Sequence, residues 1–211
     1  SACGGGSSGP ASTQVTGTFL DAAVEGVSYV AGSSARASTN AAGQFTCNTG
    51  ETVTFSVGGL LLGSAPCAQF ITPQNLAGNA AIKSDAVVNR LLTLQILDED
   101  ADPSNGIKIA ATVASALGNR SLDFSAPVAS FSPALTTTLA ALPDPYKTRP
   151  AGTGQRALAQ EHFEDTLASK IGTPYNEAVS QTGAMGTVTA TITRYTIQAA
   201  NSFYIPYEGS V

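Results

Sequence analysis

The chain has 211 residues, enough for one large domain or two small ones, and 43% of them are hydrophobic, as in a globular protein. Its formal net charge of -5 argues against a nucleic-acid partner and against binding to an anionic membrane surface. One histidine, no tryptophan and 12% charged residues leave few groups for catalysis, and no apolar run approaches the roughly 20 residues that span a bilayer.

The first ten residues, SACGGGSSGP, combine one cysteine with a run of glycine and serine. Gly/Ser segments behave as flexible coils, so residues 1–12 are predicted to form a flexible or partner-docked tether. The chain has three cysteines, and pairing two of them leaves one over, which we expect to be Cys3. Cys3 is therefore a candidate for an intermolecular disulfide, with a free thiol on a signal-peptide remnant as the alternative.

Residues 13–70 are rich in strand signals. The segment 13–20 places Val15, Gly17 and Phe19 on one face and threonines on the other, which is the period of two of a half-buried strand. A second strand is predicted at 26–30.

A β-hairpin is predicted next. Apolar residues alternate with threonine and serine in 52–57, and residues 45–47 supply the facing strand across the glycine-containing loop 48–51. Cys47 and Cys67 are predicted to form a disulfide that clamps this hairpin. Closing a loop of about 20 residues in this way stabilises a fold by roughly 3 kcal/mol.

Two resemblances follow from these residues. The stretch SACGGGSSGP resembles the junction of a bacterial lipoprotein, in which a small pair precedes an acylated cysteine and a Gly/Ser tether follows. The motifs GTFLD at 17–21 and VEGV at 24–27, with the glycine and phenylalanine spacings in 39–45 and 50–55, resemble transthyretin-like or Cna-B-like β-sandwiches of bacterial surface proteins. This second resemblance implies a β-sandwich-like module over residues 13–70 that serves as a stalk or presents a ligand, without catalytic residues.

The segment 71–211 is predicted to be mixed, with helices first and strands last, and to form one domain with the module before it or a separate one. Ser84 is a good N-cap for a helix through Leu97 with a broad apolar stripe. Further helices are predicted at 107–117, ending at Gly118, and at 132–142, opened by a Ser-Pro pair.

The densest acidic stretch, DEDADPSNGI, follows the first of these helices. Asp98, Asp100, Asp102 and Ser104 place oxygen atoms at the alternate positions that a Ca²⁺-binding loop uses, so Ca²⁺ is the one candidate cofactor. Pro103 stands where an EF-hand requires glycine, and the twelfth position lacks glutamate. A solvated acidic turn is therefore the alternative.

Residues 144–154, DPYKTRPAGTG, are predicted to be an exposed loop or hinge whose basic residues are solvated or grip an anionic group. The only histidine, His162, lies in the predicted helix 155–171 with carboxylates on both sides. A general acid/base role with Glu161 or Asp165 is conceivable. A surface histidine is the favoured interpretation, because the sequence has neither a Gly-x-Ser-x-Gly motif nor a second histidine for zinc.

The segment 186–198, GTVTATITRYTIQ, alternates threonine with apolar residues and predicts a long strand, with a bulge or change of sheet after Arg194. The aromatic stretch 202–207 is predicted to complete a sheet or dock on a partner chain. The predicted fold class is α+β, with an N-terminal antiparallel β-sandwich-like module, a helical middle and a long C-terminal strand that completes a sheet.

These features predict an exported protein that is anchored in the outer membrane, displayed on the cell surface or released. Its predicted role is structural or adhesive, without catalysis, through assembly with copies of itself into a filament or array or through binding to surface proteins. The alternatives are a calcium-dependent extracellular binding module and a hydrolase that uses His162. No nucleic-acid partner is expected, and membrane contact is expected only through a lipid on Cys3.

Overall fold

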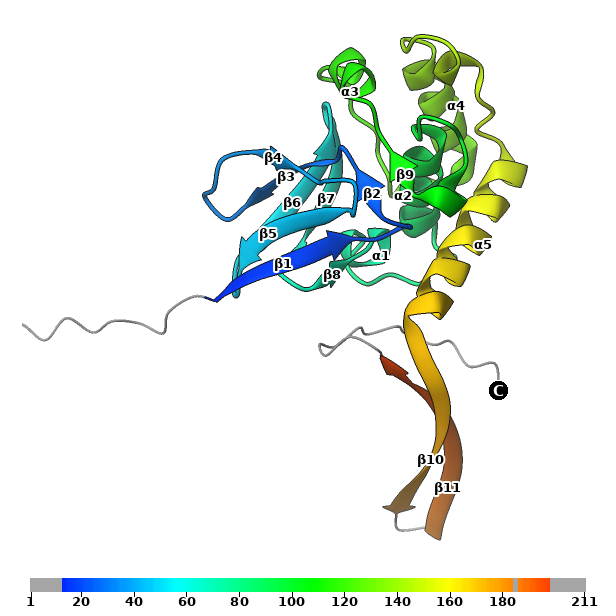
Figure 1. Cartoon of the computed structure of the whole chain (residues 1–211). Coiled ribbons are helices and arrows are strands. Elements are labelled where there is room, and N and C mark those ends of the chain that lie inside the picture. The colour runs from blue at the N-terminus through cyan, green and yellow to red at the C-terminus, as the bar shows by residue number, and fades with distance from the viewer. Residues whose placement is uncertain (1–12, 184–185, 198–211) are drawn as a thin grey trace, which may run out of the picture.

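The computed structural model describes residues 13–183 and 186–197, with side chains described through Ser169. The predicted tether with Cys3 and the predicted aromatic stretch 202–207 lie outside these residues. Within them the fold is α+β, as predicted, with mostly antiparallel strands in the first third of the chain and helices in the middle (Figure 1).

Eleven strands occur in the described residues: β1 Gln14–Phe19, β2 Val24–Glu25, β3 Ser28–Ala31, β4 Ala37–Ser38, β5 Gln44–Asn48, β6 Thr52–Val57, β7 Leu60–Pro66, β8 Phe70–Ile71, β9 Ile107–Lys108, β10 Ile171–Gly183 and β11 Gly186–Ile197. The helices in the same residues are α1 Pro73–Leu76, α2 Asp85–Ile96, α3 Ala111–Leu117, α4 Val128–Leu139 and α5 Thr153–Lys170, with 3-10 turns η1 Pro103–Asn105 and η2 Tyr146–Thr148.

The strands form two main sheets and two smaller pairs. One main sheet has the order β5-β1-β8, in which β1 is antiparallel to β5 and parallel to β8. The other has the order β4-β3-β6-β7 and is antiparallel throughout. A short parallel pair joins β2 to β9, and a separate antiparallel ribbon joins β10 to β11.

Aromatic side chains join the two main sheets. Phe19 and Phe45 come from the first sheet, and Phe55 comes from the second. The Phe19 and Phe55 rings stack with centroids 4.7 Å apart, and Phe45 meets Phe55 edge-on at 5.2 Å. Such pairs add about 0.5–1.5 kcal/mol each beyond the burial of their area. All three rings are buried, and the same apolar core continues as far as Leu167 in α5.

The predicted hairpin between residues 45–47 and 52–57 is wrong. β5 pairs with β1, with Cys47 opposite Val15, whereas β6 pairs with β3 and β7, so the two segments belong to different sheets. The turn between them bends at Gly50, whose φ is +89°. This arrangement lets Phe45 and Phe55 face each other across the core, whereas a hairpin would place them in one sheet.

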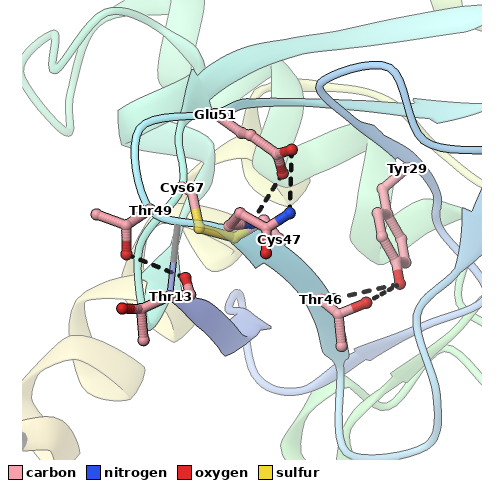
Figure 2. Close-up of a disulfide and its surroundings, with 8 residues drawn as sticks. Thr13, Tyr29, Thr46, Cys47, Thr49, Glu51 and Cys67 are labelled. Carbon is pink, nitrogen blue, oxygen red and sulfur yellow. Dashed lines mark hydrogen bonds between the residues drawn. A yellow bond between two sulfur atoms is a disulfide. The ribbon is translucent and has the colours of Figure 1, made fainter. Parts of the chain in front are cut away.

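The predicted disulfide between Cys47 and Cys67 is present, and it joins the two sheets (Figure 2). Cys47 lies in β5, and Cys67 directly follows β7, with their Cα atoms 5.9 Å apart. Glu51 fixes the turn beside it, because its carboxylate accepts hydrogen bonds from the Asn48 N–H at 2.8 Å and from the Asn48 amide at 3.1 Å. These hydrogen bonds hold the pKa of Glu51 below its usual range. The disulfide is thus a clamp between sheets.

Helix α2 is the central helix of the body. Ser84 caps it as predicted, since its hydroxyl accepts a hydrogen bond from the Val87 N–H. Nine of its twelve residues are buried, because α1, α4 and α5 all pack against it. Arg156 of α5 forms a 2.6 Å ion pair with Asp85 at the start of α2. Among the described residues, no helix is both long enough and apolar enough to cross a membrane.

Three predicted helix boundaries are wrong. Residues 107–108 form β9 beside β2 before α3 begins at Ala111. Helix α4 begins at Val128 and contains Pro133, because starting earlier allows Phe131 to be buried in the core. Helix α5 ends at Lys170, and residue 171 already belongs to β10, which was not predicted.

The ribbon of β10 and β11 extends from the end of α5, away from the two main sheets (Figure 1). Its register runs from Ile171 opposite Ile197 to Gly183 opposite Gly186. The one irregularity lies where Ile171 and Pro174 of β10 face Ile197 and Tyr195 of β11, so it falls after Arg194, where a bulge was predicted, with the extra residue in β10. Proline has no N–H to donate to the ladder, which explains why the irregularity occurs on that strand.

Candidate functional site

Two side chains that the sequence singled out, Asp98 and His162, lie around the C-terminal end of α2 with three that it did not. We call this group the α2-end cluster and define it as Asp21, Gln95, Asp98, Arg149 and His162. The residues come from the turn after β1, from α2 and the loop after it, from the segment before α5, and from α5 itself. Packing of α2 against α5 and pairing of β2 with β9 bring these elements together.

The acidic loop satisfies most of its carboxylates internally. Asp100 accepts hydrogen bonds from the Asp102 N–H at 3.0 Å and from the Asn105 amide at 2.9 Å. Asp102 accepts from the Ser104 N–H at 3.1 Å and from the Ser104 hydroxyl at 2.6 Å. These bonds are the local side-chain turns that aspartate favours. Two of the four predicted calcium ligands, Asp100 and Asp102, therefore stabilise the loop's own backbone, and Ser104 donates its hydroxyl to Asp102.

Asp98 differs from the other acidic residues of the loop because it is only 1% exposed. Its Oδ1 accepts a hydrogen bond from the Lys108 N–H at 2.8 Å, whereas its Oδ2 is buried and has no hydrogen-bond partner within the described part of the chain. Burial raises the pKa of Asp98, the Lys108 N–H lowers it, and the nearby Asp100 carboxyl raises it again. Asp98 therefore closes the base of the loop onto β9, where Lys108 also forms an ion pair with Glu99 at 2.7 Å.

The four predicted calcium ligands all lie along this loop: Asp98, Asp100, Asp102 and Ser104. In the part of the chain that the structure describes, no three His, Cys, Asp or Glu side chains converge as metal ligands. A calcium ion at this loop would have to replace the internal hydrogen bonds of Asp100 and Asp102. Calcium binding stays a prediction.

Arg149 has a structural role that its sequence context did not show. Its guanidinium donates hydrogen bonds to the carbonyl oxygens of Ile96 at 2.5 Å and Glu99 at 3.0 Å, and also to that of Asp98. It also lies over the Tyr146 ring, with its Cζ 4.5 Å from the ring centroid. The last carbonyls of a helix lack intrahelical partners and carry partial negative charge, so a cation is stabilising there. Arg149 therefore caps α2 and holds the loop after it.

Arg149→Lys is expected to lower the free energy of unfolding by about 2 kcal/mol, because one ammonium group cannot replace a planar guanidinium at three carbonyls. Urea unfolding monitored by circular dichroism measures the change. Arg120→Lys is the matched control, since Arg120 is exposed and donates to one carbonyl, that of Ala116. Equal midpoints for the two variants would contradict the capping role.

Asp21 is the most unusual ionisable residue of the cluster. It is fully buried, and both of its carboxyl oxygens lie 3.2 Å from Nε2 of Gln95. The same Gln95 amide also donates to the carbonyl oxygen of Ala159 in α5 at 3.2 Å. Burial raises the pKa of Asp21 from 3.8 to about 8, although the Gln95 hydrogen bond opposes the shift. Asp21 is therefore mostly a neutral acid at pH 7.

His162 is half-buried on α5. Its Nε2 lies 3.5 Å from the Thr166 hydroxyl, and its ring is hydrogen-bonded to the backbone of Asp21. Burial lowers the pKa of His162, whereas the Asp21 backbone and the charges of Asp165 and Asp102 raise it. His162 thus ties α5 to the turn after β1, and catalysis by His162 stays a prediction.

The cluster was only partly predictable. Asp98 and His162 stood out because one lies in a dense acidic stretch and the other is the only histidine. Asp21 belongs to the GTFLD motif, but no local feature marks it as buried. Its burial depends on α2 and α5, which are more than 60 residues away in the sequence.

Comparisons with known proteins add no identification. No family model, no curated protein and no solved structure matches the chain.

Proposed function

We propose that the chain is an exported structural or adhesive protein of a bacterial cell surface, which assembles with copies of itself or binds other surface proteins. The β10–β11 ribbon is the observation that carries this proposal. It is paired only within itself among the described residues, and it extends from α5 away from the two main sheets (Figure 1). An isolated two-stranded ribbon is marginally stable in water, so such a ribbon gains most from a partner.

The Cys47–Cys67 disulfide supports export. Disulfides persist in oxidising compartments such as the periplasm and the cell exterior, and they are rare in the reducing cytosol. This disulfide ties the two main sheets together at one end of the core, where it stabilises the body against unfolding outside the cell. The proposed role of the body is that of a sandwich-like stalk that carries the ribbon, and the proposed anchor is a lipid on Cys3.

Two measurements test the proposal. In intact cells, we expect Cys47 and Cys67 to resist a thiol-alkylating reagent until a reductant is added. The purified full-length chain is expected to show particles larger than a monomer by multi-angle light scattering and electron microscopy. The Cys3→Ser variant is the control, because it cannot form an intermolecular disulfide through residue 3, so any assembly that remains comes from other contacts, such as strand pairing. Reduced cysteines in cells would contradict export, and a monomer at every concentration would contradict self-assembly.

A further inference from the structure

The two outer edges of the ribbon remain open among the described residues. β10 has 13 residues and β11 has 12, about twice the usual strand length, and they form a sheet of only two strands. Each strand pairs along one edge and leaves the other edge without a strand partner in this part of the chain. An open edge presents a row of backbone N–H and C=O groups that can pair with another chain.

The edge of β11 has little of the usual protection against such pairing, since Arg194 is its one charged residue. Natural edge strands are shortened, bulged, or interrupted by lysine or proline. β11 contains no lysine and no proline, and its register with β10 is regular from Gly186 to Tyr195. Its residues are mostly threonine, valine and isoleucine, which favour extended strands. The sequence of β11 therefore favours pairing along its free edge.

Charge distinguishes between the ways in which two ribbons can pair. Glu177 is the only charged residue in β10, and Arg194 is the only charged residue in β11. Pairing β10 with β10, or β11 with β11, brings like charges onto neighbouring strands. Pairing β10 of one chain with β11 of another brings opposite charges together, and cross-strand pairs of opposite charge are stabilising.

We propose that the free edge of β11 in one chain pairs with the free edge of β10 in a second copy, with Glu177 opposite Arg194. Within one chain Glu177 lies opposite Ile192, so the proposed register differs by two residues and keeps each residue on its own face of the sheet. The contact joins two different surfaces and leaves one free edge at each end. Such a contact repeats into an open fibre when the rotation does not close a ring. This inference rests on the proposed function and specifies its partner and contact.

Charge reversal tests the pairing in the full-length chain with Cys3→Ser. Glu177→Arg alone and Arg194→Glu alone are each expected to raise the concentration for half-assembly by about tenfold, because each places like charges on adjoining strands. An equimolar mixture of the two variants is expected to assemble like the parent chain. The mixture is the decisive measurement, because it restores opposite charges between chains but not within a chain.

A second measurement fixes the register. In the same background, Ser180→Cys and Thr191→Cys are expected to form a disulfide-linked dimer only when the two variants are mixed, because the proposed register places these positions opposite each other. Assembly without rescue by mixing, or cross-linking of either variant alone, overturns this pairing and leaves self-assembly standing. A parent chain that is monomeric at every concentration overturns both this pairing and the proposed self-assembly. The same result is expected if residues 198–211 of the same chain cover the edge of β11.

Discussion

Asp21→Asn is expected to raise the free energy of unfolding at pH 7 by up to about 4 kcal/mol. The carboxyl group has a pKa of about 8 in the fold, against 3.8 when it is exposed to water. Each pKa unit corresponds to about 1.4 kcal/mol, and roughly three units separate pH 7 from the exposed value. Asparagine has nearly the same shape and is always neutral, so the variant avoids the cost of protonating the carboxylate at pH 7 before it can be buried beside Gln95.

The same variant is expected to flatten the dependence of stability on pH. Between pH 4 and pH 8 the folded wild-type chain keeps a proton on Asp21 that the unfolded chain has lost. Stability from this group is therefore fully present below about pH 4 and falls as the pH rises toward 8. His162 acts in the opposite direction, because its lowered pKa reduces stability as the pH falls below its ordinary value of 6.5. Both chains contain His162, so its contribution cancels in the difference between them.

Urea unfolding of both chains at several pH values between 4 and 8 measures this difference. Asp144→Asn is the matched control, since Asp144 is exposed and forms an exposed ion pair with Lys147 three residues on, which contributes little to stability. We expect the control to follow the wild type at every pH. A difference between Asp21→Asn and wild type that stays constant from pH 4 to pH 8 would show that Asp21 is ionised in the fold.

Replacing both Cys47 and Cys67 by alanine is expected to lower the free energy of unfolding by about 3 kcal/mol. The disulfide closes a loop with a sequence separation of 20, and losing it increases the conformational entropy of that loop in the unfolded chain. For a chain of this size the midpoint of thermal unfolding should fall by about 6–12 °C. Calorimetry of the oxidised wild type and the double variant measures the shift.

Cys3→Ala is the control for this experiment, because it removes a thiol without opening the clamp between the sheets. Its midpoint should match that of the wild type. A double variant that unfolds within 2 °C of the wild type would mean that the contacts of Phe19, Phe45 and Phe55 hold the sheets together without the disulfide.

Local signals predicted local structure well. The burial of Gly17 and Phe19 on one face of β1 follows the period of two, and Ser84 begins α2 where its side chain can cap the helix. The pairing of Cys47 with Cys67 followed from the count and spacing of the cysteines. In each of these cases, the interaction that determines the structure lies within one short segment, or the sequence allows few alternative pairings.

Errors arose where distant segments decide the outcome. The pattern at 52–57 identified a strand correctly, but no local feature shows that its neighbours are β3 and β7 rather than β5. The Ser-Pro pair at 132–133 is typical of a helix start, yet packing of Phe131 extends α4 back to Val128. β10 has proline and glycine near its start, which disfavour a strand, and pairing with β11 overrides that preference.

Helix α5 and strand β10 are continuous in sequence, since Lys170 ends the helix and the next residue begins the strand. Tension on the ribbon therefore passes into α5 without a compliant linker. Ala159, Phe163 and Leu167 lie four residues apart on this helix and are buried in the core. A force on the ribbon would have to remove these three side chains from the core together. The mechanical strength of any fibre built on this ribbon therefore depends on how tightly α5 packs against the rest of the fold.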